Sequence, residues 1–211
     1  MAQKQQPKCF TTFASKAMKK KHYHYKMYKP FGVLSQFTSG EERQLKKKRF
    51  LSEFYDFPNG TMPVGRLDEK SEGLLLLTTD GELSNKINGS GIEKEYIAQL
   101  DGLITQESLQ QLQKGVSIGL FGTSYTTKPC SAKNIDTPTY LSPSNPKLRI
   151  GAHRPTSWIN IILTEGKFRQ IRKMTAAVGF PTVRLIRIRV GSNTLENMTE
   201  GAVLPVTEVL I

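Results

Sequence analysis

Hydrophobic residues in this chain gather into short runs separated by glycine, proline and polar clusters, which is typical of a domain built from strands and short helices. The clearest run is Leu74 to Leu77, bounded by Gly73 and by the turn sequence TTDG at 78–81. Four consecutive leucines predict a strand that is buried on both faces. The other predicted strands are 22–28, which 33–37 extends, 93–100, 116–120, 125–132, 156–164 and 183–190.

A helix is predicted from Phe168 to Val178, because apolar residues recur there at i, i+3, i+4 and i+7. The residues on this apolar face are Ile171, Met174, Thr175 and Val178. The basic residues on another face are Arg169, Arg172 and Lys173. Gly179 and Pro181 end the helix, so one face packs on the protein and the other stays positively charged. Shorter helices are predicted at 82–88, at 104–115 and within 39–60.

The net charge of the chain indicates which kind of molecule it binds. The 211 residues include 30 Lys and Arg against 18 Asp and Glu, a formal net charge of +12. Such an excess is expected of a protein that binds a polyanion, and nucleic acid is the leading candidate. A membrane surface is the competing partner, but no apolar segment is long enough to span a bilayer, and the basic residues are scattered through folded segments. We therefore expect no membrane association.

Few residues could bind a metal ion or a cofactor. The two cysteines, Cys9 and Cys130, lie far apart, there is no Cys-x-x-Cys pair, and the chain has three histidines. Neither a zinc site nor a disulfide framework is expected, which fits a reducing compartment. The sequence contains no Gly-x-x-x-x-Gly-Lys-Ser/Thr loop and no dinucleotide-binding fingerprint. The predicted chemistry therefore uses no cofactor and no metal.

The length favours one domain, or one domain with two lobes, over two independent units. Residues 1–21 are polar and basic, without periodicity or acids, and we predict a basic, disordered tail followed by one domain at 22–211. The tail either contacts phosphates or is simply solvated. A transit peptide is disfavoured because the segment has no arginine. A proline-rich stretch at 137–153 predicts a long loop that extends from the domain.

The candidate chemistry centres on Asp68, which lies in the stretch MPVGRLDEKSEGLLLLTTDG at 62–81. Gly65 permits a tight bend that would hold the Asp68 carboxylate beside the buried strand. From the pattern alone, an ordinary solvated or capping aspartate is the competing interpretation. A carboxylate held next to a buried strand would instead be suited to catalysis.

The block at 62–81 resembles the catalytic motif of the RNA pseudouridine synthases, in particular the ribosomal branch with Gly-Arg-Leu-Asp followed by Ser-Glu-Gly-Leu-Leu. The stretch KPFGVLSQFT at 29–38 resembles the opening of the catalytic domain in the same family. The resemblance implies that Asp68 is the essential catalytic group. It also implies an α/β (α+β) fold with a mixed, mostly antiparallel central sheet flanked by helices, in two lobes with a cleft between them.

A strand tyrosine also carries the resemblance. From the pattern alone, Tyr96 in the strand at 93–100 would be a packing residue. Lys94-Glu95-Tyr96 fits the Lys-x-Tyr strand element of the family, however. This likeness implies that Tyr96 stacks on the target uracil and helps to handle a proton.

The segment GKFRQIRKM at 166–174 resembles a family motif whose arginine pairs with the catalytic aspartate. The resemblance implies that Arg172 has this role and that Leu185, in the next strand, packs beneath the target base. Phe168 departs from the family pattern, in which asparagine is usual, so the polar contact of that asparagine is not expected here.

Residues 167–189 contain seven basic side chains and no acid, more than a solvated surface requires. We predict that these uncompensated charges contact RNA phosphates. The expected substrate contacts are Arg66, Leu185, Lys167, Arg169, Lys173 and Arg187.

The family's small additional RNA-binding domain is not expected ahead of 22–211. The stretch at 137–153 resembles the insertion of the E-type branch, which modifies large-subunit ribosomal RNA, and we expect selectivity for one RNA to reside there. Together these resemblances imply a bacterial isomerase that flips out a specific uridine of large-subunit ribosomal RNA and converts it to pseudouridine. We expect it to be monomeric and cytoplasmic and to act on free ribosomal RNA or on a pre-ribosomal particle. The alternative is a non-catalytic, basic RNA-binding or ribosome-assembly protein. A metal-dependent nuclease is disfavoured because no paired acidic ligands stand out.

Overall fold

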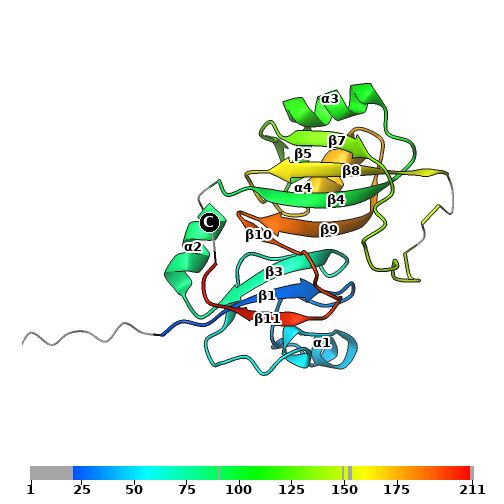
Figure 1. Cartoon of the computed structure of the whole chain (residues 1–211). Coiled ribbons are helices and arrows are strands. Elements are labelled where there is room, and N and C mark those ends of the chain that lie inside the picture. Colours follow the sequence, from blue (N-terminus) through cyan, green and yellow to red (C-terminus); the bar gives the residue numbers. More distant parts are fainter. Residues whose placement is uncertain (1–20, 90, 149, 152–153, 210–211) are drawn as a thin grey trace, which may run out of the picture.

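The computed structural model describes residues 21–89, 91–148, 150–151 and 154–209. In this part of the chain, one mixed sheet runs through both halves of the molecule (Figure 1). Its strands are β1 (His24–Lys29), β2 (Met62–Pro63), β3 (Glu72–Thr78), β4 (Lys94–Asp101), β7 (Ser131–Ile135), β8 (Thr156–Leu163), β9 (Thr182–Val190), β10 (Asn193–Thr194) and β11 (Val203–Val206). Their order is β11-β1-β3-β9-β4-β8-β7, with β2 beside β3 and β10 beside β9.

Two lobes meet where β3 lies beside β9 (Figure 1). This pairing is parallel and covers two residue pairs, whereas the other strand pairings of the described sheet are antiparallel. The helices are α1 (Glu42–Lys47), the 3-10 helix η1 (Leu51–Glu53), α2 (Gly81–Gly89), α3 (Gln106–Lys114) and α4 (Gln170–Ala177), and a separate hairpin pairs β5 (Ser117–Leu120) with β6 (Thr123–Thr126). The mixed, mostly antiparallel sheet with helices on its two lobes confirms the predicted fold.

The junction between the lobes requires a glycine. Gly73 pairs with Arg187 and has a φ of +102°, a conformation that residues with a side chain rarely adopt. A Cβ atom at this position would collide with the backbone oxygen of Arg187. The predicted bend at Gly65 is also present, with a φ of +67°.

The leucine strand is buried on both faces, as predicted. Leu74 and Leu76 pack in one hydrophobic cluster with residues such as Ile186, whereas Leu75 and Leu77 pack on the other face in a second cluster. All four leucines are at most 1% exposed. Alternating side chains of β3 therefore join two cores, which makes this strand a rigid support for the loop that precedes it.

A buried ion pair also lies beside the junction. Arg184 on β9 donates from Nε and Nη2 to the two carboxylate oxygens of Glu72 on β3, at 3.1 and 2.8 Å. The side chains are 4% and 2% exposed, so each charge depends on the other rather than on water. The pair fastens one lobe to the other.

Some predicted elements differ from the structure. The stretch 33–37 does not extend the first strand, because the chain turns at Gly32 with a φ of +80° and only an isolated bridge joins Val33 to Arg49. The stretch 125–132 is not one strand, since β6 ends at Thr126 and β7 begins at Ser131. The predicted tail at 1–21 lies outside the described residues except for Lys21.

The helix α4 begins later than predicted. Its first residue is Gln170 rather than Phe168, because Arg169 has a left-handed backbone with a φ of +53°. The predicted apolar face is otherwise present, with Ile171, Met174 and Thr175 buried.

Candidate active site

The loop that carries Asp68 is held by the segment that follows β1. Ser35 Oγ donates to the Leu67 carbonyl at 2.8 Å and accepts from the Leu67 N–H at 3.0 Å. The Gly32 N–H donates to the Glu69 carbonyl at 2.8 Å. These bonds lie on either side of Asp68, so the position of its carboxylate is fixed by its own loop and by the stretch 29–38.

Two arginines approach the Asp68 carboxylate. Arg169 Nη1 lies 3.5 Å from Asp68 Oδ2, and Arg172 Nε lies 3.9 Å from the same oxygen. The Asp68 side chain is 25% exposed, so the carboxylate is accessible to a substrate. The predicted partner Arg172 is therefore in place, and the nearer cation is Arg169.

The two arginines are anchored differently. Arg172 Nη2 donates to the Lys70 carbonyl at 2.7 Å, and Nη1 donates to the Thr182 carbonyl at 3.1 Å. Burial, together with the charge of Arg169, lowers the pKa of Arg172 below its ordinary value. Arg172 thus ties α4 and β9 to the loop of Asp68, whereas Arg169 is the more exposed of the two and can adjust to a substrate.

A cavity opens beside this carboxylate. Half-buried Tyr96 on β4 and buried Leu185 on β9 are two of its walls, and Asp68 lies between the strands and α4. Its basic lining residues are Arg66, Lys167 and Arg169. An aromatic ring, an aliphatic side chain and a carboxylate therefore face one space with cations around it, which suits a flat base attached to a phosphodiester backbone.

The expectation of seven uncompensated charges in 167–189 is wrong, because the fold supplies distant acids. Arg184 pairs with Glu72, and Arg189 pairs with Glu95 at 2.6 Å. Arg187 is 5% exposed and donates to a backbone carbonyl of β3, so it does not lie free for a phosphate.

Lys173 lies outside the lining of the Asp68 cavity. Its Nζ donates to the Gly119 carbonyl in β5 at 2.6 Å. Of the seven basic residues in 167–189, Lys167 and Arg169 line the cavity. Arg172 is outside this lining, with its Nε 3.9 Å from Asp68 Oδ2.

Two positioning residues could not be found from the sequence pattern. The Glu165 carboxylate accepts hydrogen bonds from Tyr125 Oη at 2.6 Å, the Lys128 N–H at 3.0 Å and Gln170 Nε2 at 2.6 Å. Burial alone would raise the pKa of Glu165, but these bonds lower it below its usual range. Glu165 and Gln170 thereby hold both ends of the loop 166–169, which carries Lys167 and Arg169.

A buried lysine lies behind the Asp68 loop. Lys29 is fully buried, and its Nζ donates to the carbonyls of Pro30 and Val33 at 2.8 and 2.7 Å. Burial lowers the pKa of Lys29 to about 7, although three nearby carboxylates oppose this shift.

This shift predicts a pH dependence of stability. The folded state releases the proton of Lys29 near pH 7, whereas the unfolded chain keeps it up to its ordinary pKa of 10.5. Between these two pKa values the unfolded state binds more protons than the folded state. The free energy of unfolding therefore rises as the pH is raised from 7 towards 10.5, and it falls again when the pH is lowered to 7. Lys29→Met should flatten the rise between pH 7 and 9 by roughly 2 kcal/mol in urea titrations. An unchanged slope in the variant would contradict the shift.

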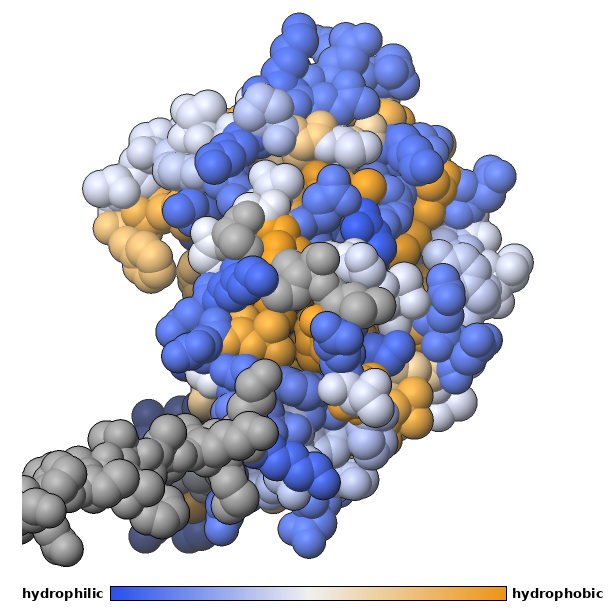
Figure 2. All heavy atoms as spheres, turned by 60° about the vertical axis from the view of Figure 1, so that its left-hand side comes forward, coloured by the Kyte–Doolittle hydropathy of each residue, from blue (hydrophilic) through white to orange (hydrophobic). Residues whose placement is uncertain are grey.

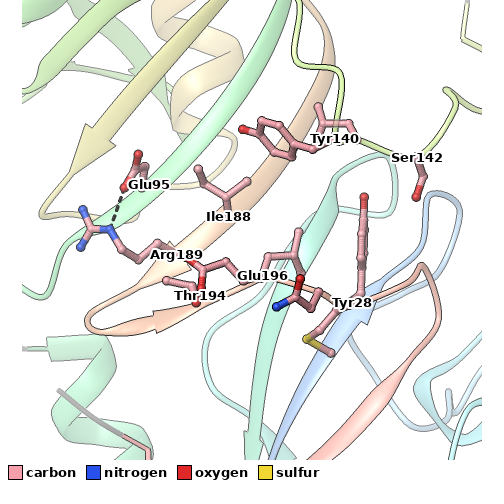
Figure 3. A pocket seen from close by; sticks show the side chains of 12 residues that line it. Tyr28, Glu95, Tyr140, Ser142, Ile188, Arg189, Thr194 and Glu196 are labelled. Atoms are coloured by element: carbon pink, nitrogen blue, oxygen red, sulfur yellow. Dashed lines mark hydrogen bonds and ion pairs between the residues drawn. The ribbon is translucent and has the colours of Figure 1, made fainter.

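A second cavity lies on the other face of the sheet (Figure 3). Tyr28 of β1 and Tyr140 of the stretch 137–153 line it, and Glu95 bonds to Arg189 on its wall. Glu95 and Tyr96 are successive residues of β4, so they point to opposite faces. This cavity measures ≈ 640 Å³ against ≈ 70 Å³ beside Asp68. It contains none of the predicted catalytic residues, so size does not locate the active site.

The surface shows where apolar side chains reach solvent between the lobes (Figure 2). On the face that brings α2 forward, hydrophobic side chains are grouped near the middle, and hydrophilic surfaces of both lobes surround them (Figure 2). Within the described residues, no group of three or more His, Cys, Asp and Glu side chains is placed to hold a metal ion. In the same part of the chain, no helix has the length and apolar character needed to cross a membrane.

Comparison with known proteins identifies the class. A family model described as RNA pseudouridylate synthase matches residues 23–177, and the chain belongs to this family. A solved structure described as a pseudouridylate synthase superposes with a TM-score of 0.70 at 26% identity, covering 89% of this chain and 71% of that one. The resemblance predicted from 62–81 is thus confirmed, and the activity class is that of an isomerase that forms pseudouridine in RNA.

Named relatives indicate which branch of the family this chain resembles. The ribosomal large subunit pseudouridine synthase E of Xanthomonas axonopodis pv. citri is 39% identical over 170 residues, which are 80% of this chain and 85% of the relative. The protein of the same name from Vibrio vulnificus is 40% identical over 177 residues, which are 82% of this chain and 70% of the relative. These relatives confirm the predicted resemblance to the E-type branch.

Proposed function

We propose that this chain isomerises a specific uridine of large-subunit ribosomal RNA to pseudouridine, with Asp68 as the catalytic carboxylate. The observation that carries the proposal is the position of Asp68 in a cavity walled by Tyr96 and Leu185, with Arg169 and Arg172 at 3.5 and 3.9 Å. Support for the choice of RNA comes from the relatives, whose names specify the ribosomal large subunit.

The proposed reaction needs no external reagent. The N1–C1′ bond of uridine breaks, the base turns, and C5 bonds to C1′; the C5 hydrogen then leaves as a proton, and N1 carries a hydrogen instead. Asp68 acts at the sugar, either as the nucleophile at C1′ or as the group that promotes a glycal intermediate. Tyr96 stacks on the base and handles the proton, and Leu185 supports the base from β9.

A uridine inside folded RNA must leave its stack to reach Asp68, at a cost of roughly a few kcal/mol. Phosphate contacts from Arg66, Lys167 and Arg169 offset this cost, and the basic residues at 1–21 add to the attraction. We propose that the protein acts as a monomer in the bacterial cytoplasm, on free ribosomal RNA or on a pre-ribosomal particle. The stretch 137–153 contributes to the choice of RNA.

Separate transcripts of large- and small-subunit ribosomal RNA test this proposal. After incubation with the protein, chromatography of the digested nucleosides should show pseudouridine in the large-subunit transcript alone. Equal formation in both transcripts would overturn the choice of substrate. Binding without pseudouridine in either transcript, or in isolated pre-ribosomal particles, would favour the non-catalytic RNA-binding alternative.

Phosphate contacts also predict a salt dependence. Each contact to a single strand contributes a slope of about −0.7 in a plot of log K against log salt concentration, so Arg66, Lys167 and Arg169 together predict about −2 or steeper. Arg66→Gln combined with Lys167→Gln should reduce the slope by about 1.4. Lys114→Gln on α3 is the control and should leave the slope unchanged. A flat salt response of the wild-type protein would contradict these contacts.

A further inference from the structure

An exposed aromatic residue stands at the tip of the β5–β6 hairpin. Phe121 is 88% exposed, so folding removes little of its ring from water. It shares a two-residue turn with Gly122, and both have positive φ values, +49° and +84°. Asparagine or glycine is favoured at the first position of such a turn, and a bulky side chain is strained there. Neither burial nor turn geometry explains this phenylalanine.

A second exposed aromatic residue lies against it. Phe168 is 56% exposed, and its ring stacks on that of Phe121 with 5.9 Å between the centroids and 27° between the planes. Phe168 lies in the loop between Lys167 and Arg169, two residues that line the cavity of Asp68. The aromatic pair therefore stands at the rim of the candidate active site. Phe168 is also the residue that departs from the sequence motif of the family.

The pair is held in place by the same contacts that fix the rim. Lys173 Nζ lies 5.2 Å from the centre of the Phe168 ring and donates to the Gly119 carbonyl at 2.6 Å, which joins α4 to the hairpin. Tyr125, on the other strand of the hairpin, donates to Glu165 at 2.6 Å. The rings are thus preorganised on two anchored elements, and ordering them on binding costs little.

From this geometry we propose that Phe121 and Phe168 form a stacking platform for an unpaired nucleobase of the substrate RNA, adjacent to the flipped uridine. The proposal rests on the proposed function and assigns it a second base-binding position. Exposed rings among cations are the combination that binds single-stranded RNA, because every base has a face that stacks and every linkage carries a negative charge. The surrounding cations are Lys167, Arg169 and Lys173. They favour a nucleic acid over an uncharged apolar protein surface.

Variants at Phe121 test the platform, because the residue lies on an exposed turn. Phe121→Ala and Phe121→Leu should raise the KM for a large-subunit RNA fragment by about 5- to 150-fold, the range that corresponds to losing one stacked base. The kcat should change little, since Asp68 and Tyr96 are untouched. Phe121→Trp should recover most of the affinity, because it restores a ring where leucine restores only apolar surface. Leu204→Ala, at an exposed position on β11, is the control.

Abasic substrates identify the base. A single abasic nucleotide is placed in turn at each position next to the modified uridine. In the wild-type protein, one position should raise KM, and in Phe121→Ala the same position should have no further effect. Independent, additive losses would overturn the platform. Phe168→Asn, which restores the residue usual in the family, should behave as Phe121→Ala does; if it fails to fold in a thermal melt, the Phe121 variants still decide.

A binding measurement separates this proposal from the catalytic one. The anisotropy of a labelled, uridine-rich single strand reports affinity whether or not pseudouridine forms. Wild-type protein that binds this strand at least about fivefold more tightly than Phe121→Ala supports the platform even if no isomerisation occurs in any RNA. If wild-type protein and Phe121→Ala have equal affinities for this strand and equal KM values, the platform is overturned. The same result is expected if the aromatic pair binds a protein instead of RNA.

Discussion

Asp68→Asn should abolish pseudouridine formation and leave RNA binding in place. The amide keeps the size of the side chain but removes the negative charge that Arg169 and Arg172 approach at 3.5 and 3.9 Å. Turnover should fall by at least about 10³-fold, the scale seen when a nucleophile or a charge-stabilising group is lost. Nucleoside chromatography under saturating RNA gives the turnover, and filter binding gives the Kd.

The neighbouring residue of the same loop supplies the control. Glu69 bonds to Lys48 at 2.8 Å rather than to either arginine, so Glu69→Gln should keep turnover close to that of the wild-type protein. Near-normal turnover of Asp68→Asn would remove this residue from catalysis. A similar loss in both variants would place the effect in the folding of the loop.

Breaking the buried pair at the junction of the lobes should cost about 3–5 kcal/mol of unfolding free energy. In Glu72→Ala, Nε and Nη2 of Arg184 lose the carboxylate that they contact at 3.1 and 2.8 Å. The Arg184 side chain is 4% exposed, so its charge is left buried without a partner unless the side chain moves. Equilibrium unfolding in urea measures this loss. Since β3 and β9 join here, activity should fall with the folded fraction.

A double replacement distinguishes two causes of the lost stability, the unpaired charge of Arg184 and the lost packing of the Glu72 side chain. Glu72→Leu with Arg184→Met removes both charges and should recover most of the stability, since no unpaired charge remains. The exposed pair Arg49–Glu53 is the control, and Arg49→Gln should cost at most about 1 kcal/mol. A cost for Glu72→Ala as small as that of this surface pair would contradict the role of the junction.

Local sequence patterns correctly predicted those elements whose structure is determined by residues close together in the sequence. Four leucines predicted the doubly buried strand β3, and spacing predicted the buried face of α4. The resemblance also predicted residues that the fold brings to one cavity, since Asp68, Tyr96 and Leu185 come from three separate segments and line the same space.

Other features depend on contacts between distant parts of the chain, which a local pattern does not contain. Arg184 and Arg189 were counted as free cations, but their partners are Glu72 and Glu95, 112 and 94 residues away. Glu165 accepts a hydrogen bond from Tyr125 of β6, 40 residues earlier in the chain, which no spacing rule would assign to it. The late start of α4 follows from the left-handed backbone of Arg169, which the helical periodicity of the segment conceals.

Release of tritium from large-subunit RNA labelled at C5 of uridine tests the central claim most directly, because C5 loses its hydrogen only if it forms the new bond to C1′. With enzyme in excess, the wild-type protein should release one equivalent of tritium for each modified site, and Asp68→Asn should release none while it still binds the RNA. Wild-type protein that binds this RNA without releasing tritium, or a variant that releases it at the wild-type rate, would contradict the assignment of Asp68 as the group that rearranges the nucleoside.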